Sequence, residues 1–336
     1  MISRPPASAS IKCAWPLRSK AAIAVLLTLA SASVSPARSD DATPAWAFPV
    51  NPPDFKLPPD NGQLQRVPDS NVALPVAKTR DRFFAPDWHP EDHPAMPEIV
   101  ARGRKPDVFA CGFCHRADGP GGPENASLAG LPAAYIAEQM ADFRSGARKS
   151  SVAERVPPRL MTQVAKNATD SEIQEAAAYF SALKPKSLIK VVETETVPKT
   201  SVMGWYLADL KTGECEPIGA RIIEMPEDQQ QFENRDARSR FIAYVPVGSI
   251  EKGKLLAATG GVNAVPCGTC HGADLKGVGP IPGLAGRSPS YIVRQLYDFK
   301  HGARAGTNSA LMKPVVEKLG DGDMVALAAY AASLAP

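Results

Sequence analysis

The sequence predicts a mainly α-helical protein in which two tandem helical domains are joined by a β-rich connector. An internal repeat is the first observation behind this prediction. Between Cys111 and Arg148, 18 of 38 positions are identical to those 156 residues later. Apolar residues at helical spacing inside each copy are the second observation. Three runs rich in β-branched and aromatic residues, which lie between the copies, are the third.

Each copy contains a predicted amphipathic helix after a shared Leu-Ala-Gly. In "YIAEQMADFRSGAR" of the first copy, apolar residues recur at i, i+4 and i+7, and Gly146 is the expected end of the helix. The same face recurs in "YIVRQLYDFKHGAR" of the second copy. There Ser288 is the expected N-cap, and Pro289 is suited to the first helical position.

Another helix closes each copy, and one more precedes each repeated cysteine motif. Thr169 and Glu172 form a capping-box pattern at the start of the closing helix of the first copy. Asp321 starts the equivalent helix of the second copy. The preceding helices are expected over residues 97–105 and 249–259.

The first residues have the features of a signal peptide. Four positive side chains precede the apolar run "AAIAVLLTLASASV", which is shorter than the roughly 20 residues of a membrane-spanning helix. An uncleaved membrane anchor is the alternative. The predicted segments are a signal peptide, an extended Pro-rich arm, a first helical domain, the β-rich connector and a second helical domain, over residues 1–37, 38–96, 97–186, 187–247 and 248–336.

The charge of the chain argues against nucleic acid as a partner. The formal charge is +3, and removal of residues 1–37 takes away four positive side chains and no acid, which leaves 3 − 4 = −1. No basic run remains after that removal, and nucleic-acid binding normally requires one.

The repeated cysteine motif carries the chemistry. "DVFACGFCHRADG" and "VPCGTCHGADLKG" each contain Cys-x-x-Cys-His, in a chain with six cysteines and five histidines. Zinc is a weak alternative because adjacent cysteine and histidine chelate poorly, and a disulfide leaves the histidine without a role. Covalent haem uses all three residues, since the two thiols bind the porphyrin and the histidine binds iron.

A second axial ligand to iron is expected in each copy. Met161 and Met312 are the aligned methionines, and both are predicted to lie in loops before the closing helix. His89 and His93 lie in the proline-broken "DWHPEDHP", where solvated histidines are the favoured interpretation and a surface metal site is the alternative.

These motifs resemble those of the tandem two-haem class I cytochromes c of the c-four type. The resemblance covers residues 97–185 and 247–336 and leaves the arm and the connector outside it. It implies two covalently bound haem c groups. In this sequence the implied thioether cysteines, proximal histidines and distal methionines are Cys111, Cys114, Cys267 and Cys270, then His115 and His271, then Met161 and Met312.

The resemblance also implies a function without catalysis. Such proteins carry single electrons in the periplasm or at its membrane surface, from a dehydrogenase or a quinol-oxidising donor to a terminal acceptor. The implied partners are redox proteins, and no small-molecule substrate is expected. Two alternatives remain, which are a dihaem cytochrome c peroxidase and the cytochrome subunit of a periplasmic dehydrogenase. In the second, the long connector would dock the partner.

The two copies differ at the position that orients the proximal histidine. In the family a proline carbonyl has this role, and the second copy offers Pro280 and Pro282. The first copy has Glu124 and Ala126 at the aligned positions. The resemblance therefore implies that the two reduction potentials differ.

Some repeated or isolated residues have two interpretations. The pairs Tyr135 with Tyr291 and Gln139 with Gln295 either pack helices or face haem. Cys215, in the connector, lies outside both motifs, and its alternatives are a buried thiol or an intermolecular disulfide.

Overall fold

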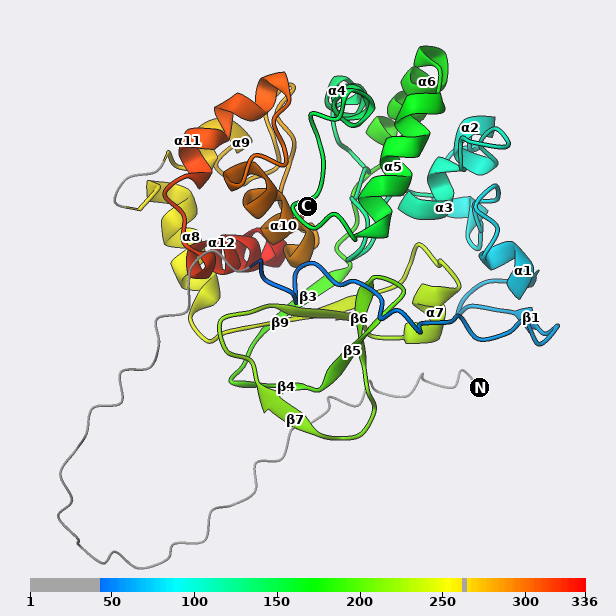
Figure 1. Ribbon diagram of the computed structural model, residues 1–336, viewed down its shortest axis with the longest axis horizontal. Coiled ribbons are helices and arrows are strands. Elements are labelled where there is room, and N and C mark those ends of the chain that lie inside the picture. The colour runs from blue at the N-terminus through cyan, green and yellow to red at the C-terminus, as the bar shows by residue number, and fades with distance from the viewer. Residues whose placement is uncertain (1–42, 262–264) are drawn as a thin grey trace, which may run out of the picture.

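The computed structural model describes residues 43–261 and 265–336, so the signal peptide expected over residues 1–37 lies outside the described part. Figure 1 shows how these residues are arranged in three regions. The helices of the first copy lie at the upper right, in cyan and green. Those of the second copy lie at the upper left, in yellow to red, and the strands between the copies lie below both.

The helices of the first copy follow local sequence signals. They are α2 (Glu98–Ala101), α3 (Cys111–His115), α4 (Ala133–Ser145), α5 (Val156–Asn167) and α6 (Asp170–Ala182). Gly146 adopts a φ of 80° and ends α4, as predicted. The Thr169 hydroxyl accepts from the backbone of Glu172, whose carboxylate accepts from the Thr169 backbone, so the predicted capping box starts α6.

Two predictions for the first copy were wrong. The helix expected over residues 97–105 is the single turn α2, because the chain reverses at Gly103, which has a φ of 66° and lies against the backbone of Val108. Met161 lies inside α5 rather than in a loop. Prolines in the first turn of α5 start this helix, since the N–H groups of a first turn have no partner within the helix.

The helices of the second copy are close to those predicted. They are α8 (Ser249–Thr259), α9 (Gly268–His271), α10 (Pro289–Lys300), η2 (Thr307–Leu311), α11 (Lys313–Val316) and α12 (Asp321–Ser333). Ser288 caps α10 by accepting from the backbone of Tyr291 at 3.2 Å. Met312 lies between η2 and α11. Gly253 of α8 lies against the carbonyl of Ala326 in α12, so these two helices touch through their backbones.

The connector contains strands in each of the three predicted runs and three more that were not predicted. The strands in the predicted runs are β3 (Ile189–Glu193), β4 (Thr196–Pro198), β8 (Ile223–Pro226) and β9 (Phe241–Val245). The further strands are β5 (Thr200–Met203), β6 (Tyr206–Asp209) and β7 (Cys215–Pro217), and the short helix α7 (Gln229–Glu233) precedes β9. The central sheet has the order β3-β9-β8, with β3 parallel and β8 antiparallel to β9. Two antiparallel pairs, β4 with β7 and β5 with β6, form separate two-stranded sheets.

The arm is more ordered than expected. It contains β1 (Leu64–Gln65), β2 (Leu74–Pro75), α1 (Val76–Thr79) and η1 (Pro90–Asp92). The interpretation of His89 and His93 as solvated is wrong. The side chains of these residues are 3% and 4% exposed, because the arm folds back on the rest of the chain. The imidazole of His89 lies 3.2 Å from a carboxylate oxygen of Asp236 in the connector. Among the described residues no group of three or more potential ligands could hold a metal ion.

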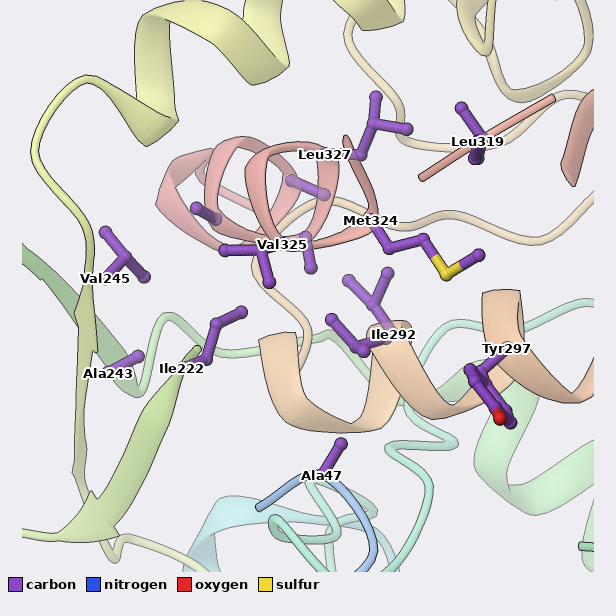
Figure 2. Close-up of a cluster of buried hydrophobic side chains, with 14 of the residues drawn as sticks. Ala47, Ile222, Ala243, Val245, Ile292, Tyr297, Leu319, Met324, Val325 and Leu327 are labelled. Carbon is purple, nitrogen blue, oxygen red and sulfur yellow. The ribbon is translucent and has the colours of Figure 1, made fainter. Parts of the chain in front are cut away.

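The core of the second copy extends into the arm and the connector. Figure 2 shows Ala47 of the arm and Val245 of β9, which belong to the same buried cluster as Met324 and Val325 of α12. Each of these side chains is at most 3% exposed. The connector is therefore part of a folded core and not a passive link. Within the described residues, no helix has both the length and the apolarity to cross a bilayer.

Candidate functional site

A cavity of about 1370 Å³ extends between the two copies. Its walls come from both copies, from the arm and from the connector. It is lined by all eight residues predicted to hold the cofactors, which are Cys111, Cys114, His115, Met161, Cys267, Cys270, His271 and Met312. The fold thus brings together groups that lie as much as 201 residues apart in the chain, counted from 111 to 312.

The two motif helices present their reactive groups in the same way. In α3 the cysteines are three residues apart and the histidine follows, so all three lie on neighbouring positions of one turn. In the second copy Cys267 is the N-cap of α9. The residue after each histidine, Arg116 or Gly272, has a positive φ of 69° or 83° and ends the helix.

Each histidine that is predicted to be a proximal ligand is oriented by a backbone carbonyl. The Nδ1 of His115 lies 2.8 Å from the oxygen of Ala126, and the Nδ1 of His271 lies 2.7 Å from that of Pro282. A carbonyl only accepts, so Nδ1 carries the proton and Nε2 is left as an acceptor. Burial lowers the pKa of both histidines, which favours the neutral form that binds metals. The first copy needs no proline for this contact, because the orienting group is the backbone carbonyl.

The two methionines reach the cavity from different local structures. Met161 projects from α5, whereas Met312 lies at the junction of η2 and α11. Both are partly buried and line the same cavity as the histidines. Met324, by contrast, is 1% exposed and belongs to the apolar core.

The charge of the cavity wall fits an anionic cofactor. Five buried arginines line it against two buried carboxylates, and these residues are Arg116, Arg148, Arg155, Arg294 and Arg304, then Glu124 and Asp298. The Nε atoms of Arg116, Arg155 and Arg304 are buried without a hydrogen-bond partner. A buried N–H group without an acceptor is unfavourable, and the positive charges outnumber the buried carboxylates, so a ligand with acidic groups is expected beside them. The propionates of haem satisfy this requirement.

The two copies exchange hydrogen bonds beside the cavity. Arg148 of the first copy donates to the hydroxyl of Tyr291 at 2.8 Å and to Gln295 Oε1 at 2.9 Å. The equivalent Arg304 donates to Gln139 Oε1 of the first copy at 2.7 Å. Their backbones also pair in an antiparallel bridge. We call these two arginines with their tyrosine and glutamine partners the crossed network.

The crossed network answers one question that the sequence left open. The repeated tyrosines and glutamines line the cavity and also bind across to the other copy. The arginines were missed, although Arg148 and Arg304 are identical residues of the repeat. Conservation between the copies within a "GAR" turn was the signal that could have identified them.

Comparison with known proteins gives a consistent result. A profile of the cytochrome c family matches residues 250–335. Cytochrome c4 of Azotobacter vinelandii is 37% identical over 244 residues, which cover 71% of this chain and 89% of that protein. The thiosulfate dehydrogenase electron acceptor of Thiomonas intermedia is 28% identical over 232 residues, which cover 68% of this chain and 80% of that protein. A solved thiosulfate dehydrogenase of Marichromatium purpuratum is 29% identical with a TM-score of 0.46, and the match covers 68% of this chain but only 37% of that longer one.

The paired motifs, the cavity and these similarities define a two-domain dihaem cytochrome of class I. Its cofactors are two covalently bound haem c groups, and its general role is electron transfer. The chain belongs to the cytochrome c4 family.

Proposed function

We propose that this protein is a non-enzymatic one-electron carrier, and that it works in the periplasm between a dehydrogenase and a terminal acceptor. The observation that carries the proposal is the matched donor set of the cavity. Each copy contributes one of the repeat-aligned methionines, Met161 or Met312, and a histidine whose Nε2 has no hydrogen-bond partner among the described residues. Met140 of the first copy also lines the cavity, but its aligned residue in the second copy is Leu296. Two axial ligands at each iron leave no coordination position for a substrate. This arrangement favours a carrier over a peroxidase.

Different residues of the chain attach the cofactors and set their reduction potentials. We assign Cys111 and Cys114 to the first haem and Cys267 and Cys270 to the second, as thioether attachments. When bound, each haem supplies a one-electron iron couple. Methionine as the distal ligand raises the reduction potential relative to histidine. The carbonyls that hold Nδ1 of the proximal histidines fix the imidazole planes.

The donor is proposed to be a dehydrogenase. Support comes from the relatives that are described as electron acceptors of thiosulfate dehydrogenase. A quinol-oxidising donor is the alternative within the same function. Export is supported by the charged and apolar pattern of residues 1–37. Residues 97–186 and 248–336 are the proposed cytochrome domains, with the connector between them.

A second candidate is the cytochrome subunit of a dehydrogenase complex. The arm and the connector favour it, since they add ordered structure outside the two cytochrome domains. Removing the connector is a poor test, because Ala243 and Val245 of β9 are fully buried in the core of the second copy. Co-purification of the tagged chain from its own periplasm is the better test. A stoichiometric dehydrogenase would support the subunit, and a free monomer would support the mobile carrier.

Spectroscopy of the purified holoprotein tests the main proposal. The haem content is measured in alkaline pyridine, and oxidised and reduced spectra are recorded. Two covalent haems per chain, both low-spin and with the methionine–iron charge-transfer band, are expected. A high-spin haem, or a haem that binds carbon monoxide readily, would contradict the assignment of Met161 or Met312 as ligands and would favour the peroxidase.

A further inference from the structure

The two motif helices differ in their exposure to solvent. In α3 the side chain between the cysteines, Phe113, is 5% exposed, and Gly112 is also buried. At the aligned positions of the second copy, Gly268 is half-buried and Thr269 is exposed. The helices themselves are equivalent, so the difference comes from segments that pack on the outside of α3.

The arm supplies the first of these segments. The carbonyl of Arg82 accepts from the backbone of Ala110, directly before α3, at 2.9 Å. Ala85 lies so close to Gly112 that a side-chain carbon added at Gly112 would approach it to 2.8 Å. The arm therefore packs closely on α3, because small residues, Ala85 in the arm and Gly112 in α3, meet at the contact.

The connector supplies the second segment, a turn after α7. Arg235 has a φ of 62°, and its guanidinium carbon lies 3.7 Å from the centroid of the Phe113 ring. The same guanidinium donates to the carbonyls of Phe113 at 3.1 Å and Thr79 at 3.2 Å. The indole of Trp88 in the arm donates to the carbonyl of Asn234 at 2.8 Å, which holds this turn in place. We call residues 79–85 and 234–235 the cap.

Arg235 is a cation without a neutralising carboxylate among its hydrogen-bond partners, which are carbonyl oxygens. Burial lowers the pKa of Arg235 to about 10, so it stays protonated at neutral pH. Arg116, the other guanidinium at this helix, is paired with the carboxylate of Glu124 at 3.4 Å and contributes less net charge. Both of these hydrogen bonds and the ring contact of Arg235 are made to the arm and to α3 of the first copy.

We propose that the cap holds the reduction potential of the first haem above that of the second through the charge of Arg235. Reduction of a ferric haem by one electron from a donor lowers the charge at iron by one unit, so a fixed cation nearby stabilises the reduced form. At an effective dielectric constant of about 20, a unit charge within about 10 Å changes such an equilibrium by roughly one order of magnitude. The inference rests on the proposed electron-carrier function.

The test is a spectroelectrochemical titration of the holoprotein and its variants. Arg235→Gln removes the charge, and Arg235→Lys keeps it. Lys199→Gln is the matched control, because it removes one exposed cation from the connector away from the cavity. Met161→His identifies which wave belongs to the first haem, since histidine ligation lowers the potential of the haem that it binds.

Arg235→Gln is expected to lower the equilibrium constant for reduction of the first haem about tenfold, which is about 59 mV for one electron. The reduction potential of the second haem is expected to stay unchanged. Arg235→Lys and Lys199→Gln are expected to stay within a factor of two or so of the parent. Unchanged potentials in a folded Arg235→Gln variant with two haems would overturn the inference, as would an equal shift in Lys199→Gln. If the Arg235→Gln variant does not fold or does not retain haem, the Arg235→Lys variant is the test. A tenfold fall in the reduction constant of the first haem in Arg235→Lys, which keeps the charge, would overturn the inference. A parent without two methionine-ligated waves would instead contradict the proposed function.

Discussion

Replacement of Arg148 by methionine is expected to destabilise the protein more than any exposed substitution nearby. The change keeps the length of the side chain but removes three hydrogen bonds, one to Gln139 at 2.8 Å and two across the interface to Tyr291 and Gln295 at 2.8 and 2.9 Å. Hydrogen bonds to charged groups contribute about 1.5–3 kcal/mol each, so a loss of about 4.5–9 kcal/mol is expected for Arg148→Met. The two copies should then unfold in separate transitions, because the crossed network joins them.

Urea unfolding of the holoprotein, followed by circular dichroism, measures this effect. Lys149→Met is the control, since the side chain of Lys149 is exposed. Its hydrogen bond across the interface, to the carbonyl of Ala303, is made by the backbone N–H and is kept in the variant. That control is expected to stay within about 0.5 kcal/mol of the parent. A cycle of Arg148→Met with Tyr291→Phe should give a coupling energy of about 1–3 kcal/mol. A coupling energy of zero, or equal effects of Arg148→Met and Lys149→Met, would refute the reasoning.

Three further outcomes are expected. Met312→Ala should make one haem high-spin and able to bind carbon monoxide, as seen by absorption spectroscopy, whereas Met324→Leu in the core should leave the spectrum unchanged. Gly253→Ala should lower the free energy of unfolding by about 1–3 kcal/mol in urea, because the new methyl group meets the backbone of α12. Hydrogen bonds from Arg104 lower the pKa of Glu172 to about 2, against burial, which raises it. The ionised Glu172 therefore contributes stability above the unfolded pKa of about 4.3, and this contribution is lost as the pH falls towards 2. Glu172→Gln should have a lower free energy of unfolding than the parent at neutral pH. Between neutral pH and about pH 2.5, that free energy should fall less in the variant than in the parent.

Features set by neighbouring residues were predictable from the sequence. Gly146 ends α4, Thr169 and Glu172 start α6, and Ser288 caps α10, because each of these signals acts within four residues. The cysteine motifs were equally local. Their repetition identified the eight candidate residues, and the structure then places all eight on the wall of one cavity.

Features that depend on packing between distant segments were not predictable. The proline-broken stretch around His93 has the composition of an exposed loop, yet Tyr179 of α6 and Asp87 bind its imidazole. The segment around Met161 contains two prolines and was assigned to a loop, but their position in a first turn suits a helix. The orienting contact of His115 was obscured because a backbone carbonyl, here that of Ala126, carries no signature in the sequence.

The cap also bears on how the protein is matured. Thioether bonds at Cys111 and Cys114 require an attachment machinery to reach the outer side of α3, where Phe113 is now buried beneath Arg235. The residues that cover this side come from chain positions 79–85 and 234–235, which close over it only in the folded state. We therefore expect attachment of the first haem to precede docking of the connector, whereas Thr269 and Cys270 of the second motif remain exposed in the folded chain.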